Sequence, residues 1–259
     1  MTSVSNTQCS SVRFEAAGRL VLSEARLAWR SPRGLAFGVG LPLGMLVLFG
    51  ELPRFKQHPA GLGGLSRFAA EVPVLAAFVI AALALLVLAG PLTSYRELGI
   101  LRRMSITPVR PVWLLAAQLV VNLAVALIAL IVLFGVAVAA FGVAAPKDPG
   151  ALVLSLALCA CALFALGLFI AAVAPNSGTL VAIEAGSFFP LIFLAGLWVP
   201  VQEMPTALQD TSNYTALGAA VQAAQDAMEG TFPPARPLLV MAGWAVVFGL
   251  AAWRFFRWE

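Results

Sequence analysis

Residues Tyr95 to Val112 read YRELGILRRMSITPVRPV and separate two long apolar runs. The stretch carries one acid, Glu97, and four arginines: Arg96, Arg102, Arg103 and Arg110. Lys and Arg close to membrane spans resist translocation, so a short loop this basic is expected on the cytoplasmic side. The stretch is therefore predicted to be a cytoplasmic loop between two candidate membrane spans.

The order of residues in this loop also predicts local structure. Arg96, Glu97 and Gly99 can open a short helix, and Pro108 and Pro111 then end it, because proline disfavours helical geometry in the residue before it. Apolar residues give that helix one hydrophobic face that could contact a partner. A solvated basic loop that only sets topology explains the same composition, and composition alone leaves both interpretations open.

The same loop resembles a known family. Its pattern Glu97-x-Gly99-x-Leu101-x-x-Met104-x-x-Thr107-Pro108 is similar to the E-x-G-x-L-x-x-L-x-x-T-P pattern of type 2 ABC transporter permeases, the membrane subunits of many bacterial exporters. Met104 stands where Leu is commoner. The resemblance implies that one set of residues couples this chain to an ATPase: Arg96, Glu97, Gly99, Leu101, Met104, Thr107 and Pro108.

A second stretch strengthens the resemblance. Residues 193–200 read FLAGLWVP and are followed by Met204-Pro205, which is similar to the family's F-L-S-G-x-x-x-P…L-P motif with Ala195 in place of Ser. The usual N-P-L further on reads NYT, without its proline. The resemblance implies an external-loop motif that contains Gly196, Pro200 and Pro205.

Composition predicts a polytopic membrane protein. Hydrophobic residues make up 61% of the 259 residues and charged residues 11%, whereas soluble domains have roughly half and a quarter. A chain of this length forms one membrane domain with no room for a separate soluble enzyme. The net charge of +4 does not indicate nucleic-acid binding, because the basic residues cluster at span ends.

No catalytic or metal site is expected. The chain lacks the G-x-x-x-x-G-K-[ST] phosphate-binding motif, so it is not itself the ATPase. His58 is the single histidine, which excludes a Ser/His/Asp set within a span and gives no metal cluster. Cys9, Cys159 and Cys161 provide no disulfide framework. No cofactor is expected on this chain; ATP and Mg belong to the partner ATPase.

The apolar runs predict an all-α fold of six transmembrane helices, with a Pro/Gly-containing loop from Glu51 to Pro73. Before the spans, residues 1–34 form a cytoplasmic segment with an amphipathic interfacial helix, whose anchors include Arg19, Arg26, Trp29 and Arg30. An ordinary soluble helix is the alternative there. A short helix is expected over 216–228. The approximate spans are 35–52, 74–94, 112–142, 151–174, 180–200 and 237–254.

Charge sets the predicted orientation, with both termini cytoplasmic. Eleven of the 16 Lys and Arg residues then lie inside: in the first 34 residues, in the loop Tyr95–Val112 and after the last span. The other five lie outside. This is the positive-inside pattern.

Several residues inside the spans are candidates for a pathway. Gln118 and Asn122 lie one helical turn apart, so they share a face that is expected to meet another helix. Glu184 is the one acid in the predicted spans and has either a functional or a structural role, such as capping a neighbouring helix. Phe189 and Phe193 belong to an aromatic stripe that either packs the core or lines a path.

The expected function follows from the resemblance and the topology together. The chain is expected to be the permease of an ABC exporter in a bacterial cytoplasmic membrane, moving a hydrophobic or amphipathic, drug-like substrate. Its partners would be membrane lipids, a cytoplasmic P-loop ATPase and a second permease, as homodimer or heterodimer. Alternatives are export of a lipid-linked glycan, a secondary transporter, or an immunity membrane protein without ATPase coupling.

Overall fold

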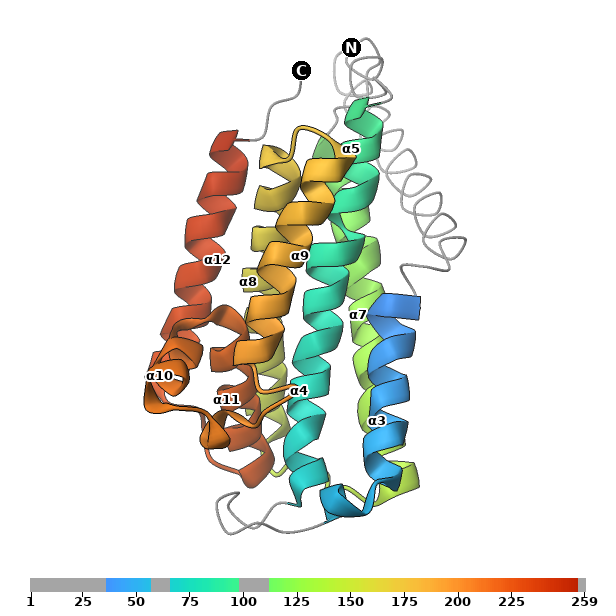
Figure 1. Ribbon diagram of the computed structural model, residues 1–259, viewed down its shortest axis with the longest axis vertical. Coiled ribbons are helices and arrows are strands. Elements are labelled where there is room, and N and C mark those ends of the chain that lie inside the picture. Colours follow the sequence, from blue (N-terminus) through green and yellow to red (C-terminus); the bar gives the residue numbers. More distant parts are fainter. Residues whose placement is uncertain (1–35, 57–65, 98–111, 256–259) are drawn as a thin grey trace, which may run out of the picture.

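The computed structural model describes residues 36–56, 66–97 and 112–255, and all regular structure in these ranges is helical. Long helices run side by side along one axis, and shorter ones cover one end (Figure 1). The described helices, in chain order, are η1 (Ala36–Gly40), α3 (Leu41–Glu51), η2 (Pro53–Lys56), α4 (Arg67–Ala82), η3 (Leu83–Val87), α5 (Ala89–Glu97), α7 (Val112–Phe141), α8 (Pro149–Val173), α9 (Ser177–Leu194), η4 (Val201–Glu203), α10 (Thr206–Tyr214), α11 (Ala216–Glu229) and α12 (Ala235–Phe255).

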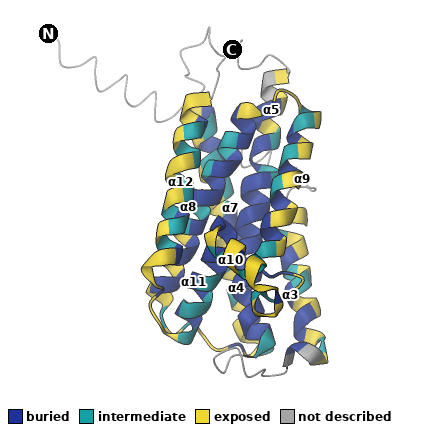
Figure 2. Ribbon diagram, turned by 60° about the vertical axis from the view of Figure 1, so that its left-hand side comes forward, coloured by how far each residue is buried: buried dark blue, intermediate teal, exposed yellow. Residues whose placement is uncertain are grey.

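The rod formed by α4, η3 and α5 is the centre of the bundle. Every residue from Phe68 to Leu85 is buried, because α3, α7, α8, α9 and α11 all pack on α4. Figure 2 shows this rod in the colour of buried residues, while the outer helices alternate buried and exposed faces. A helix that is apolar all round needs neighbours on every side, and the neighbouring helices supply them.

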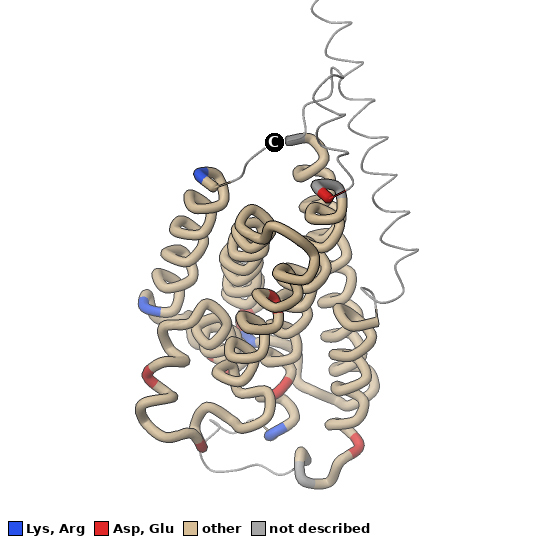
Figure 3. Tube along the Cα trace, turned by 45° about the horizontal axis from the view of Figure 1, so that its top comes forward, with Lys and Arg blue, Asp and Glu red and all other residues tan. Residues whose placement is uncertain are grey.

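The outer helices expose apolar side chains as a lipid environment requires. Leu127, Ile128 and Ile131 of α7 are each more than half exposed, and α12 exposes Val246 and Leu250 in the same way. Charged positions of the described residues gather mainly at the helix ends (Figure 3). The chain is therefore a multi-pass, all-helical membrane protein.

Among the described residues, five helices are long and apolar enough to cross a membrane: Arg67–Ser94, Trp113–Phe141, Pro149–Val173, Ser177–Leu194 and Ala235–Phe255. The first expected span is represented by the shorter apolar helix Ala36–Glu51. That this shorter helix also crosses the membrane, for a total of six spans, stays a prediction. The cytoplasmic location of both termini stays a prediction as well. The predicted interfacial helix lies outside the described residues.

Two helices differ in extent from the predicted spans. The helix of the second predicted span begins at Arg67 instead of residue 74, because Ser66 caps α4 by accepting a 3.1 Å hydrogen bond from the Ala69 amide. Pro73 lies inside α4, where Gln225 of α11 donates a 3.0 Å hydrogen bond to the Ala70 carbonyl. Neighbouring helices can satisfy backbone groups near a proline in this way.

The fifth span ends at Leu194 instead of residue 200. Gly196 adopts a φ of 96°, which side-chain-bearing residues rarely reach, and the chain leaves the helix there. The expected helix over 216–228 is confirmed as α11. It begins at the Thr215 cap, whose hydroxyl accepts a 3.0 Å bond from the Gly218 amide, and it ends at Gly230 with a φ of 88°.

One close approach fixes α8 against the central rod. A Cβ atom placed on Gly167 of α8 would collide with the backbone carbonyl of Ala84 in η3. Small residues allow this kind of backbone approach between membrane helices, where van der Waals packing drives association. Gly167 therefore sets the distance between α8 and η3.

We expect Gly167→Val to destabilise the protein by about 1–3 kcal/mol, because a branched side chain must push α8 away from η3. The measurement is thermal unfolding of purified protein in detergent. Gly135→Val on α7 is the matched control, since a Cβ at Gly135 meets no atom within 4 Å. Equal unfolding temperatures for both variants would contradict this role of Gly167.

Candidate functional site: the corner between α5 and α9

The carboxylate of Glu97 joins the end of α5 to the start of α9. One oxygen, Oε1, accepts a 2.7 Å hydrogen bond from the backbone amide of Ser177. The other, Oε2, accepts a 2.7 Å hydrogen bond from the Ser177 hydroxyl. Both oxygens of an acid at the end of one helix thus bind the first residue of another, 80 residues later in the chain.

The start of α9 favours an acid at this place. Its first amides lack partners within the helix, and the helix dipole places partial positive charge there. The Asn176 side chain caps the amide of Thr179, from which it accepts a 2.8 Å hydrogen bond. The Ser177 hydroxyl and then the Ser177 amide lower the pKa of Glu97 below its ordinary value. We call Glu97, Asn176, Ser177 and Thr179 the α5–α9 corner.

The corner lies where the predicted coupling loop begins. Glu97 is the last residue of α5, and Arg96 precedes it in the same helix. Five predicted coupling residues lie outside the described residues: Gly99, Leu101, Met104, Thr107 and Pro108. The predicted interfacial residues Arg19, Arg26, Trp29 and Arg30 also lie outside them.

The aromatic stripe of α9 divides between two faces. Phe188 is buried and meets Phe78 of α4 edge-on, with ring centroids 5.5 Å apart. Phe189 points outward and is 56% exposed, and Phe193 is 37% exposed. The Phe193 ring lies 6.4 Å from that of Trp198, which is also exposed. Phe188 is therefore a core residue, whereas the other three form an outward aromatic face.

Glu184 lies on the buried face of α9, one turn before Phe188. Its side chain is only 7% exposed, and its Oε1 atom has no hydrogen-bond partner among the described residues. Among the described residues, this atom therefore does not cap a neighbouring helix. Ionised groups are costly at such a position, which makes Glu184 a functional candidate.

Glu71 is a second buried acid that the sequence analysis did not include, because the second span was predicted to begin only at residue 74. Glu71 of α4 is 7% exposed and lies within the Arg67–Ser94 span. The starting signal was Ser66, an N-cap residue directly before the helix. Ser177, the partner of Glu97, could not be found in the sequence, because nothing local links residues 80 positions apart.

Gln118 and Asn122 lie on α7 as expected, but their roles differ. Gln118 is 3% exposed. The Asn122 amide donates a 2.9 Å hydrogen bond to the Gln118 backbone carbonyl, within the same helix. The bond that the structure gives Asn122 is therefore not the interhelical bond that the spacing suggested.

The second sequence motif shapes the opposite end of the bundle. Gly196 makes the left-handed turn after α9, Pro200 precedes η4, and Pro205 precedes α10. These turns bring Glu203 to Arg67, with a 2.8 Å ion pair between Oε1 and a guanidinium nitrogen. A cavity of about 380 Å³ lies beside this pair, lined also by Glu71, Gly196, Pro200 and Trp198.

Within the described ranges, no group of three or more His, Cys, Asp or Glu side chains is placed to hold a metal ion. The arrangement supports a mechanical role, in which movement of one helix is passed to another. The corner ties two helices together, and α9 carries both the tied end and the outward aromatic face.

We expect Glu97→Ala to loosen the first turn of α9, seen as faster hydrogen exchange at the Ser177 and Thr179 amides. The pKa of Glu97 is lowered in the folded state, so its contribution is complete above the ordinary carboxyl pKa of about 4.3 and is lost as the pH falls further. Glu51→Ala is the control, because Glu51 also ends a helix and is exposed. The difference between Glu97→Ala and wild type should shrink in acid. Unchanged exchange in Glu97→Ala at neutral pH would exclude the capping role.

We expect Glu184→Gln to retain normal amounts of protein, whereas Glu184→Lys is destabilised by about 3 kcal/mol. Gln keeps the shape without a charge, but Lys places a cation among buried apolar side chains. The readouts are the amount of protein in the membrane and its unfolding temperature in detergent. Glu51→Lys, an exposed position, controls for the added charge. Normal stability of Glu184→Lys would mean that the side chain reaches water or headgroups.

Comparison with known proteins assigns the family. A comparison with curated protein sequences found no match. The sequence model of the ABC-2 type transporter family matches residues 17–228, which include the α5–α9 corner, both motifs and most of the spans. This is the family that the two motifs indicated, and its members are membrane permeases and not themselves catalytic subunits. The chain belongs to the ABC-2 type transporter family.

Proposed function

We propose that this chain is the transmembrane subunit of an ATP-driven exporter in a bacterial cytoplasmic membrane. It moves a hydrophobic or amphipathic, drug-like substrate outward, and a separate cytoplasmic P-loop ATPase supplies the energy. The family supports the permease role and implies an ABC ATPase partner. The direction, the substrate and the coupling are our inference.

The single observation that carries the coupling is the double hydrogen bond between Glu97 and Ser177. The loop that the sequence assigns to ATPase contact follows directly after Glu97. A displacement of that loop pulls on Glu97, and two 2.7 Å bonds pass the pull to the first turn of α9. Charge-assisted bonds of this kind are about twice as strong as neutral ones, so the connection suits the transmission of force.

The outward face of α9 supports the second part of the proposal. Phe189 and Phe193 are exposed on the helix that Glu97 holds, and the exposed Trp198 lies just after the end of that helix. We assign this face to the boundary with a second permease copy, where an amphipathic substrate would pass. Aromatic side chains suit this role because they offer large apolar area with defined geometry. Motion of α9 would then change the boundary between the copies.

A secondary transporter is the competing function. It would need an ionisable group within the membrane, and Glu184 and Glu71 are the buried acids of the described spans. The two mechanisms differ in their energy source. ATP dependence favours the exporter, whereas dependence on a proton gradient favours the alternative.

The test uses inverted membrane vesicles that contain the chain and the P-loop ATPase that co-purifies with it, with a fluorescent amphipathic dye. We expect ATP-dependent dye uptake in wild type and in Glu51→Ala. Glu97→Ala should retain the ATPase and its hydrolysis but take up dye severalfold more slowly, because the connection to α9 is broken. Normal uptake in Glu97→Ala would contradict coupling through the corner.

One further outcome would overturn the exporter itself. Uptake that persists without ATP and stops when an uncoupler removes the proton gradient would assign the chain to the secondary transporters.

A further inference from the structure

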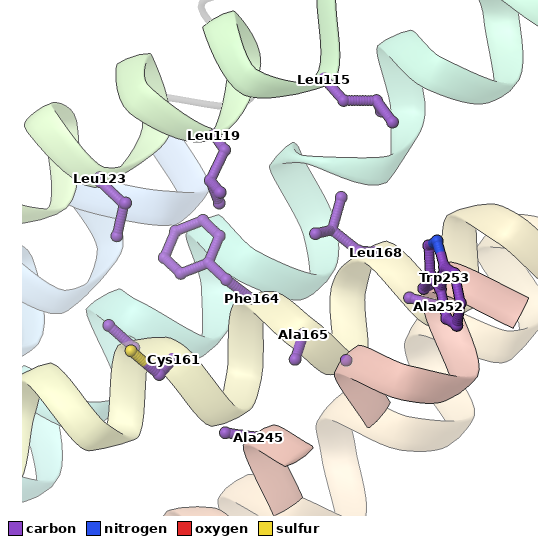
Figure 4. A pocket seen from close by; sticks show the side chains of 12 residues that line it. Leu115, Leu119, Leu123, Cys161, Phe164, Ala165, Leu168, Ala245, Ala252 and Trp253 are labelled. Carbon is purple, nitrogen blue, oxygen red and sulfur yellow. The ribbon is translucent and has the colours of Figure 1, made fainter. Parts of the chain in front are cut away.

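A second feature of the molecule lies away from α9. A cavity of about 530 Å³ is formed by the first half of α7 and the last halves of α8 and α12. Leu115, Leu119 and Leu123 line one wall at a spacing of four residues, so they form one stripe of α7. Figure 4 shows these leucines facing Phe164 and Leu168 of α8, with Trp253 of α12 at one end.

The cavity lies between helices that pack on different partners. The packing partners of α7 are α3, α4 and η3, whereas α12 packs along α8. Phe169 of α8 lies between Phe248 and Phe255 of α12, with ring centroids 5.5 and 6.1 Å away. The side of α8 that α12 leaves uncovered faces α7 across an apolar groove.

We propose that this groove binds an acyl chain of an anionic phospholipid from the leaflet at the Glu97 end of the bundle. The inference does not depend on transport or on an ATPase. The groove is lined by helices that are long and apolar enough to cross a membrane, and its named lining residues are apolar.

The shape of the groove suits a flexible chain. Between Leu115 and Leu123 the groove runs for about 12 Å along α7, and its volume is about 530 Å³. A flexible hydrocarbon chain adapts to such a space.

A basic residue follows the tryptophan at the end of the groove. Trp253 lines the groove and is 81% exposed, and Arg254 comes next in the last turn of α12. Trp and Arg at a span end lie at headgroup level. Because apolar side chains gain little by exchanging one hydrocarbon neighbour for another, selectivity must come from shape and from charge. We therefore assign the selection of an anionic headgroup to the guanidinium of Arg254.

The probes are phosphatidylglycerol and phosphatidylcholine that carry the same photoactivatable acyl chain, incorporated into vesicles with the full-length protein. Adducts are mapped by mass spectrometry. We expect phosphatidylglycerol adducts on peptides that contain Leu115–Leu123 and Ala245–Trp253. Adducts spread evenly over all exposed helix faces would overturn the proposal.

Two glycines of α12 give a matched pair of variants. A Cβ at either Gly249 or Gly243 meets no atom within 4 Å, but only Gly249 lines the groove. Gly249→Leu should fill the groove and reduce its adducts severalfold, while Gly243→Leu leaves them unchanged. Equal reduction in both, or none in Gly249→Leu, would overturn the proposal.

Two arginines of the same helix test the headgroup. Arg254→Gln should reduce the preference for phosphatidylglycerol over phosphatidylcholine about fivefold, which is the effect expected of one basic residue near an anionic surface. Arg236→Gln, at the opposite end of α12, should leave the preference unchanged. A preference that survives in Arg254→Gln would overturn the assignment of this residue.

Cys161 distinguishes a lipid from a second copy of the chain. It is exposed and lines the groove, whereas Cys159 on the same helix is buried. In a Cys9→Ser background, a short bifunctional thiol reagent should leave the protein uncrosslinked through Cys161. Efficient linkage of two copies through Cys161 would show that a second copy covers the groove. That result would overturn the proposal that a lipid occupies it.

Discussion

The burial of the rod from Arg67 to Ser94 on all sides is the constraint on which the rest of the structure depends. In a membrane, lipid tails solvate an apolar helix as well as protein does, so the rod is held by close packing and not by exclusion from water. Its surface is rich in alanine from Ala76 to Ala84, and Gly167 of α8 touches its backbone at Ala84. Small side chains thus let the surrounding helices approach closely.

This rod connects the two ends of the molecule. At one end Arg67 pairs with Glu203, beside the cavity that the second motif shapes. At the other end Glu97 caps α9. Helix α9 is held at both of its ends, because the Ser212 hydroxyl also donates a 2.6 Å hydrogen bond to the Leu194 carbonyl. Between these ties α9 meets the rod through apolar contacts, such as that of Phe188 with Phe78.

The π-helical turn η3 interrupts the rod midway along its length. Such turns break the regular hydrogen-bond ladder and often occur at functional sites. Here η3 contacts α7, α8 and α9, so a change in the rod at this point reaches three outer helices. The aromatic face of α9 and the apolar groove beside α7 are therefore both built on helices that contact η3.

The sequence by itself determined the membrane class, the all-helical fold, the family and most span positions, because apolar runs and loop charges act locally along the chain. It also singled out Glu97, Glu184 and Gly196, whose residue types are conspicuous where they stand, but it did not predict that α9 ends before Gly196. Only the tertiary structure decided that Glu97 meets Ser177, that Phe188 points inward while Phe189 points outward, and that Pro73 stays inside a helix. Each of these depends on a partner from a distant part of the chain, and the identity and direction of that partner are set by how the helices pack.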